Sequence, residues 1–362
     1  MSVSLDQSPP RLRLGRVPAL DGARAVAVLL VMGYHAGIAG FAGGRAGVDV
    51  FFVLSGFLIT ALLLEERARH GAIRLGAFYM RRVLRLYPAL IATTLFALAL
   101  AALKMPVFDA SSSSLVNTLQ MAPFTLLYTA NLPRAAGWGG GGYLGHTWSL
   151  SIEEQFYLIW PLVVIVVMRR RSTPVVLGWI ALGCAVASAV LRAGLDLAGY
   201  SSEMLYNATF THVDGIFAGC ALAVLWALRP DAIAWVARPT LTLLATLAAT
   251  FVIIDGQNMN VYGFSVVVIA TLAVLCDLLA RRESRLSASM SHPALVAVGR
   301  RSYGLYLYHW PIFLFIGIDT RPHILALGFG ASFAVAWMSY AWIEVPFLRM
   351  KDRWATQQST SS

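Results

Sequence analysis

Ten long apolar segments restrict this chain to one class of fold. Their approximate limits are 19–38, 48–65, 84–104, 148–168, 174–195, 205–228, 234–254, 261–280, 302–318 and 323–347. An α-helix needs about 20 apolar residues to cross the hydrocarbon core of a bilayer. Hydrophobic residues make up 58% of the sequence and charged residues only 13%, which is more apolar surface than a soluble domain can bury. We therefore predict an all-α membrane protein, a polytopic bundle of about ten transmembrane helices.

The basic residues indicate the orientation of this bundle. With the N-terminus in the cytoplasm, 23 of the 28 Lys and Arg residues fall in cytoplasmic tails and loops or at helix ends beside them, as the positive-inside rule requires. We expect both termini to be cytoplasmic, with a basic tail over 1–17, one transmembrane domain over 18–349 and a polar tail over 350–362. The net charge is +10. The basic residues behind it form no stripe interleaved with aromatic residues, so we expect no nucleic-acid partner.

The connection 105–147 is the longest between two apolar segments. It contains the serine run Ser111–Ser114 and the glycine run Gly139–Gly142, so we expect a long, flexible loop. Within it, residues 115–130 are apolar, but the stretch is short and contains Pro123. We interpret it as an interfacial or re-entrant piece.

The first apolar segment carries an arginine and a histidine at opposite depths. His35 follows Arg24 by eleven positions, which is about 16–17 Å along an α-helix and roughly half of the hydrocarbon core. Ionisable residues inside a membrane are costly and usually functional. The alternatives are that Arg24 is a topology anchor and that His35 is a core histidine bonded to a carbonyl.

Further ionisable residues fall in the predicted outer half of the membrane, on three other segments: Asp49, Glu153, Glu154, His212 and Asp214. Together with His35 they suggest a carboxylate–imidazole site facing outward, whereas the inner face carries Arg24 and the cluster Arg81, Arg82 and Arg85. Adjacent residues on a helix point about 100° apart, so we expect only Glu153 of the Glu pair to face the site readily. Asp49 and Asp214 can also be read as partners of helix N-termini.

Four stretches, by their order and spacing, resemble the membrane acyltransferase-3 family of bacterial O-acyltransferases. They are Leu20-Asp21-Gly22-Ala23-Arg24 with His35 eleven positions on, the run 47–59, the run 147–157 and the run 302–309. The resemblance implies transfer of an acyl group, often acetyl from acetyl-CoA, to a hydroxyl. Acyl-CoA would be a co-substrate, and we expect neither a permanently bound cofactor nor a metal.

The resemblance also implies roles for particular residues. The arginine–histidine pair of the family corresponds to Arg24 and His35, and its second arginine motif corresponds to Arg82 and Arg85. The family often has an arginine two residues before the aspartate of the sixth helix, where this chain has His212 before Asp214. No SGNH-type soluble domain follows Arg349, so we expect any helper enzyme to be a separate protein.

These residues suggest a mechanism that matches their predicted depths. Coenzyme A phosphates suit Arg24, Arg82 and Arg85 at the inner face, because arginine binds phosphate in a bidentate way. His35 would be the general base for the acceptor hydroxyl, oriented by Glu153 in the manner of a catalytic triad. An acyl-histidine intermediate remains an alternative.

Further site candidates follow from the same topology. Asp49 and His309 are additional catalytic candidates, and the acceptor-side candidates are Trp148, Glu154, His212, Asp214 and Tyr303. The acceptor would be a carbohydrate, a lipid-linked sugar or a small-molecule hydroxyl, and the protein would be a multi-pass protein of the inner cell membrane. The rival hypotheses are a proton-coupled transporter and a polysaccharide assembly partner, although the sequence shows no internal repeat of the transporter kind.

The charge distribution gives a testable topology. Cysteines introduced at Arg74, Arg170 and Arg285 should resist membrane-impermeant thiol reagents in intact cells, because these loops are predicted to be cytoplasmic. A cysteine near Gly140 should react, as a control on the other side. Labelling at the three arginine positions but not near Gly140 would reverse the orientation.

Overall fold

The computed structural model describes residues 14–103, 113–169, 174–317 and 319–350, which form helices and turns without a strand. Most of the predicted tails 1–17 and 350–362 lies outside these residues. The helices are α1 (Pro18–His35), α2 (Gly47–His70), α3 (Leu75–Leu103), α4 (Ser113–Leu126), α5 (Asn131–Ala135), α6 (Trp148–Arg169), α7 (Pro174–Leu197), α8 (Ser202–Asn207), α9 (Asp214–Leu228), α10 (Pro230–Val236), α11 (Pro239–Asp255), α12 (Phe264–Ala280), α13 (Arg285–Met290), α14 (Pro293–Arg300), α15 (Ser302–Ile316) and α16 (Pro322–Ser339). Short 3₁₀ segments (η1, Gly44–Ala46; η2, Gly142–Thr147; η3, Thr209–Thr211) and π-helical segments (η4, Met259–Gly263; η5, Tyr340–Glu344) adjoin them.

The predicted all-helical fold is confirmed, and each predicted apolar segment contains a helix. Among the described residues, six helical stretches are long and apolar enough to cross a membrane, or seven if α9 and α10, bent by 119°, form one span. The predicted number of ten spans and the side on which the termini lie remain predictions.

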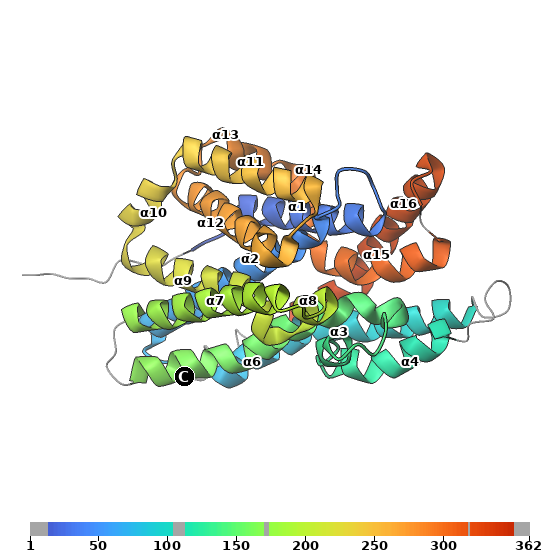
Figure 1. Ribbon diagram of the computed structural model, residues 1–362. Coiled ribbons are helices and arrows are strands. Elements are labelled where there is room, and N and C mark those ends of the chain that lie inside the picture. Colours follow the sequence, from blue (N-terminus) through green and yellow to red (C-terminus); the bar gives the residue numbers. More distant parts are fainter. Residues whose placement is uncertain (1–13, 104–112, 170–173, 318, 351–362) are drawn as a thin grey trace, which may run out of the picture.

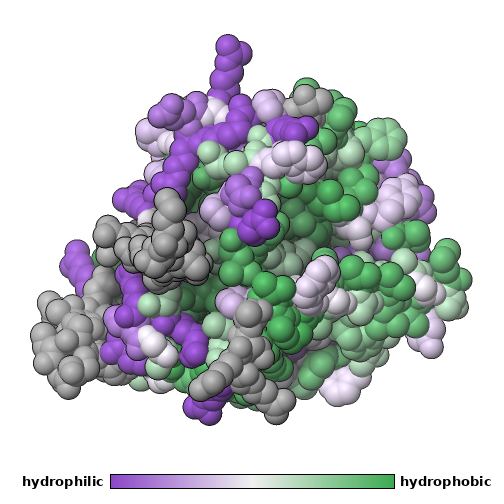
Figure 2. Space-filling view, turned by 90° about the vertical axis from the view of Figure 1, so that its left-hand side faces the viewer, coloured by the Kyte–Doolittle hydropathy of each residue, from purple (hydrophilic) through white to green (hydrophobic). Residues whose placement is uncertain are grey.

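Most of the long helices lie side by side along roughly one direction (Figure 1), with α1, α2, α11 and α12 in the upper part of the view and α6 and α7 in the lower part, whereas α16 runs obliquely. Large apolar side chains on their outer faces are more than half exposed, among them Leu95, Trp179, Val190, Leu243 and Phe251. Figure 2 looks at the end of the bundle where α1 begins and shows hydrophobic residues along the right-hand side. Such a surface suits a multi-pass membrane protein.

Two predicted element limits are wrong. Helix α3 begins at Leu75 rather than near 84, because the arginines between these positions are good helix formers, so Arg81 and Arg82 lie on the same helix as Arg85. The last span before Arg229 begins at Asp214 rather than near 205, because α8 and η3 occupy the residues before it.

The described part of the 105–147 connection is not a structureless loop, which corrects the prediction. It contains α4, α5 and η2, and the predicted re-entrant piece 115–130 is α4 followed by a turn. The glycine run forms the turn before η2, since Gly139 and Gly141 have φ values of 84° and 73°, which other residues adopt only with strain. Residues 104–112 lie outside the described residues.

Helices α2 and α9 approach each other backbone to backbone. A Cβ atom at Gly56 would collide with the carbonyl of Ile216, and one at Gly219 would collide with the carbonyl of Val53. Small residues that let helix backbones approach closely are the usual device for packing helices in membranes. This contact fixes α2, and with it every site residue that α2 carries.

The start of α1 is held in the same way. A Cβ at Gly22 would meet the carbonyl of Met290, and one at Gly299 on α14 would meet the carbonyl of Asp21. The Asp21 carboxylate also lies 3.6 Å from Nε of Arg300. Part of the Leu20–Arg24 motif therefore has a packing role, which holds the part of α1 from which Arg24 lines a cavity inside the bundle.

We expect Gly219→Ala to lower the unfolding temperature in detergent, because overpacking a tight helix contact costs about 1–3 kcal/mol. The matched control is Gly183→Ala on α7, where an added Cβ meets nothing within 4 Å. This control should be neutral or slightly stabilising, since alanine favours helix by about 1 kcal/mol over glycine. Equal unfolding temperatures for the two variants would contradict the proposed packing.

Candidate functional site

Two cavities lie end to end inside the bundle and share two of their lining residues, Val48 and Tyr306. The first we call the arginine cavity; its charged lining residues are Arg24, Arg82, Arg85, Glu153 and Glu154. The second we call the histidine cavity; its ionisable lining residues are Tyr34, His35, Arg45, Arg134, His146, Glu203, Tyr206 and Tyr306. Arg24 near the start of α1 and His35 at its end thus face different cavities.

The arginine cavity brings together the three arginines that the sequence singled out. Arg24 comes from α1, and Arg82 and Arg85 come from α3. The guanidinium carbon of Arg82 lies 4.0 Å from the centre of the Tyr157 ring, a cation–π contact that holds its side chain against α6. No ion pair within 4.0 Å joins these arginines to Glu153 or Glu154 among the residues that the structure describes.

Both glutamates of α6 line this arginine cavity, which corrects two expectations. They lie with the arginines and not with His35, because α6 begins at Trp148 beside the histidine cavity and each following residue lies about 1.5 Å further along the helix axis. Both side chains reach the cavity although they point about 100° apart, since the cavity is lined along this face of α6 from Ser149 to Tyr157. Glu153 accepts a hydrogen bond from Ser55 of α2.

Two tyrosines line the arginine cavity from elements that are far apart in the sequence. Tyr303, predicted as an acceptor-side residue, lines this cavity from α15 and donates a hydrogen bond of 2.9 Å to the carbonyl of Leu86. Tyr128 lines it from the turn after α4, with a left-handed backbone φ of 53°. Its carbonyl accepts a hydrogen bond from Gln155. Strained non-glycine residues of this kind concentrate at functional sites.

His35 in the histidine cavity is oriented by His309 rather than by Glu153. His309 Nδ1 lies 3.0 Å from the carbonyl of Leu305, and because a carbonyl only accepts, this nitrogen carries the proton. His309 Nε2 is then the acceptor for Nδ1–H of His35, at 2.9 Å. It follows that Nε2 of His35 carries the free lone pair, so His35 is arranged as a base with a neutral orienting partner.

Aromatic and imidazole rings surround this base. The ring of Trp310 lies 4.6 Å from that of His35, centre to centre, and Tyr34 lies 5.4 Å from it. Trp148, predicted on the acceptor side, lines the same cavity. His146, which the sequence analysis did not nominate, bonds through Nε2 to the carbonyl of Leu307. Its position directly before the motif of residues 147–157 was the available signal.

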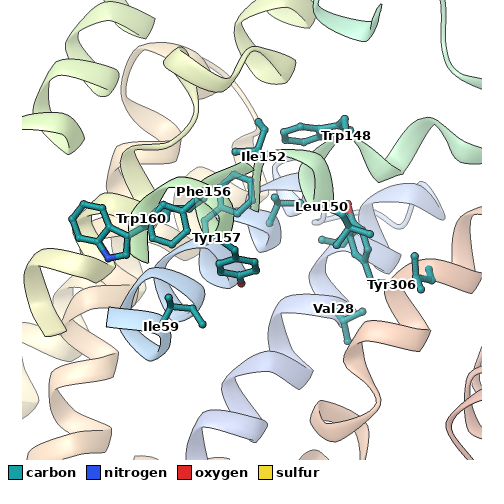
Figure 3. Close-up of a cluster of buried hydrophobic side chains, with 14 of the residues drawn as sticks. Val28, Ile59, Trp148, Leu150, Ile152, Phe156, Tyr157, Trp160 and Tyr306 are labelled. Atoms are coloured by element: carbon teal, nitrogen blue, oxygen red, sulfur yellow. The ribbon is translucent and has the colours of Figure 1, made fainter. Parts of the chain in front are cut away.

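Tyr306 and Val48 line both cavities, and we call the place where the cavities adjoin the neck. The Tyr306 hydroxyl donates to the carbonyl of His146 at 2.8 Å and lies 2.6 Å from Oγ of Ser149. Because the proton of Tyr306 is engaged by a carbonyl, Ser149 is the donor in the second bond. Figure 3 shows Tyr306 extending from α15 into the cluster that α6 builds with Trp148, Leu150 and Tyr157.

Asp49, His212 and Asp214 line neither cavity. They belong to a buried network behind Trp148, whose ring lies 5.5 Å from that of His212. Asp49 is bonded to His212 at 3.1 Å. Asp214 receives two hydrogen bonds of 2.6 and 2.8 Å from Arg192 of α7, a fully buried residue.

Arg192 is the main partner that sequence reasoning missed. It belongs to an apolar segment without a recognisable motif, and only its isolation as a charge in that segment was a signal. The family often has an arginine two residues before this aspartate, where this chain has His212. In this chain Arg192 supplies the guanidinium to Asp214 instead. Among the described residues, no group of three His, Cys, Asp or Glu side chains is arranged to hold a metal ion.

Comparisons with known proteins identify the family of the chain. A family model described as "Acyltransferase domain" matches residues 17–342. The peptidoglycan O-acetyltransferase OatA of Listeria monocytogenes is 30% identical over 346 residues, which cover 91% of this chain and 55% of that protein. The O-acetyltransferase OatA of Staphylococcus aureus is 30% identical over 357 residues, 91% of this chain and 57% of that protein. The chain thus spans little more than half the length of these relatives, and no solved structure is significantly similar to it.

The buried network makes a prediction about stability. Arg192→Met should destabilise the protein by about 3–5 kcal/mol, because it leaves the Asp214 carboxylate buried without its cation. Arg192→Met combined with Asp214→Leu should recover most of the loss, since neither charge then remains. Thermal unfolding in detergent measures both variants, with Arg229→Met as the control because its partner Asp231 is 68% exposed. Arg192→Met with the unfolding temperature of the wild type would show that the pair is not structural.

Proposed function

Because the chain belongs to the acyltransferase-3 family, we propose that it is an integral-membrane O-acyltransferase that uses acyl-CoA, with acetyl as the most suitable acyl group. The observation that carries the proposal is the pair of cavities that meet at one neck. One cavity has the charge to hold an anion, and the other contains a base with a free lone pair. Group transfer between two separately bound substrates needs this combination.

The donor is proposed to occupy the arginine cavity. Coenzyme A carries several phosphates, and Arg24, Arg82 and Arg85 offer planar guanidinium groups suited to phosphate. Within the described residues no ion pair joins them to a carboxylate, so their donors are available. Acyl-CoA is then a co-substrate from the cytoplasm, and the protein is proposed to lie in the inner cell membrane.

The pantetheine arm would bring the thioester to the neck beside Val48 and Tyr306. The rise of α1 between Arg24 and His35 is about 16–17 Å, which is of the order of that arm's length. Nε2 of His35 would accept the proton of an acceptor hydroxyl while the hydroxyl oxygen attacks the thioester carbonyl. The carbon–sulfur bond breaks, the new ester bond forms, and the proton on His35 passes to the leaving thiolate. His309 keeps the imidazole in the tautomer that this step needs.

The acceptor is proposed to be a hydroxyl of a carbohydrate or glycolipid that enters the histidine cavity. Tyr34, Trp148, Tyr206 and Trp310 line that cavity, and aromatic faces of this kind pack well against sugar rings. The relative named as a peptidoglycan O-acetyltransferase supports a carbohydrate acceptor. A secondary-metabolite hydroxyl is the remaining acceptor class for the same chemistry.

The proposal predicts different defects at the two cavities. His35→Ala should reduce single-turnover transfer of radioactive acetyl from acetyl-CoA about 10²–10⁴-fold, because it removes the general base, while acetyl-CoA affinity stays unchanged. Arg82→Ala should instead weaken acetyl-CoA binding, measured by calorimetry.

The control is His70→Ala at the exposed end of α2, outside both cavities, which should transfer acetyl at the wild-type rate. If His35→Ala also transferred acetyl within a few-fold of wild type, His35 would not be the base. If the purified wild type transferred no acetyl to any hydroxyl acceptor, the proton-coupled transporter hypothesis would be favoured instead.

A further inference from the structure

Arg45 is a cation of the histidine cavity whose guanidinium group has no anionic partner in the described part of the chain. The cavity is lined by two arginines, Arg45 and Arg134, and by one carboxylate, Glu203. Each nitrogen of the Arg134 guanidinium has a partner: Nε donates to Asn207 at 3.1 Å, Nη1 donates to the carbonyl of Gly140, and Nη2 lies 3.2 Å from Glu203. The charge of Arg134 is therefore compensated within the protein.

The guanidinium of Arg45 is held by aromatic rings instead. Its central carbon lies 5.0 Å from the ring centre of Tyr206 and 5.3 Å from that of Phe264. No hydrogen bond or ion pair from this guanidinium is formed with residues 14–103, 113–169, 174–317 or 319–350. Asp49, one turn further along the chain, bonds to His212 rather than to Arg45.

This arrangement suits an arginine that binds a ligand. Stacking on aromatic faces fixes the plane of a guanidinium and leaves its edge free for a planar or tetrahedral anion. A partly buried cation without a counter-charge is unfavourable, and an anion in the cavity removes this cost. With Arg134 and Glu203 compensating each other, one positive charge remains to be matched.

We infer that the histidine cavity recognises an acceptor sugar that bears one anionic group, with this group on Arg45 and the reacting hydroxyl at Nε2 of His35. The inference rests on the proposed function and narrows its acceptor class. The anion is a carboxylate or a phosphate, carried either on the sugar itself or on the lipid to which the sugar is linked. Both form bidentate, charge-assisted hydrogen bonds with arginine.

The test compares three acceptors that share one sugar ring: methyl glucoside, methyl glucuronide and glucose linked through a diphosphate to a short polyprenol. Purified protein in detergent receives radioactive acetyl-CoA, and kcat/KM is measured for each acceptor. Wild type should favour at least one anionic acceptor over methyl glucoside by about 10- to 100-fold, the range of one charge-assisted hydrogen-bond pair. The preferred anionic acceptor distinguishes a sugar carboxylate from a lipid-linked phosphate.

Variants of Arg45 then assign the preference. Arg45→Gln should lose the preference while acetyl-CoA affinity is unchanged, and Arg45→Lys should recover part of it, because the charge remains without the fork geometry. The control is Arg321→Gln, an exposed arginine paired with Asp319 outside both cavities. It should retain the full preference.

A binding measurement separates failure of this inference from failure of the proposed function. Trp148 and Trp310 line the cavity, so quenching of tryptophan fluorescence by the three acceptors reports binding without turnover. Equal affinity of wild type for neutral and anionic acceptors, or equal losses for all three in Arg45→Gln, would overturn the role of Arg45. Preferential binding of an anionic acceptor without any acetyl transfer would support Arg45 and overturn the proposed function.

Discussion

The close contact between the backbones of α2 and α9 positions the rest of the site. Gly56 and Gly219 let the two helices touch without side chains between them. Helix α2 then presents Val48 and Ser55 to the cavities, while the start of α9 presents Asp214 to Arg192. In a bilayer, where lipid tails are as apolar as the side chains, such packing replaces much of the hydrophobic drive for helix association. The proposed acyl transfer thus depends on a helix contact made by two glycines, Gly56 and Gly219.

The charged residues inside the bundle fall into two groups, those paired within the protein and those that line a cavity. The pairs Arg192–Asp214 and His212–Asp49 are closed within the protein and line no cavity. Arg24, Arg82 and Arg85 line a cavity and form no ion pair with a carboxylate of the residues that the structure describes, as expected of groups held for a ligand. Counter-charge, more than depth in the membrane, distinguishes the two sets of residues.

The sequence predicts helices better than it predicts side-chain partners. Long apolar segments and an eleven-residue spacing were enough to place Arg24 and His35 on one helix, because helix geometry depends on local sequence. Grouping residues by depth alone wrongly assigned Glu153 and Glu154 to the side of His35. It also gave no sign of Arg192, nor of the bond between His35 and His309, which are 274 positions apart. Such contacts depend on how α1 and α15 pack, and spacing along the chain does not encode this packing.

The hydrogen bonds of Tyr306 at the neck determine how often its side chain can rotate. Two hydrogen bonds hold its hydroxyl, and breaking both costs about 1–3 kcal/mol. A rotation of Tyr306 that frees its hydroxyl is then roughly 5 to 150 times less populated than the bonded conformation. Because enzymes typically turn over in about 1 ms to 1 s and side-chain rotations are commonly far faster, such a rotation would leave the rate of the proposed transfer to the chemistry.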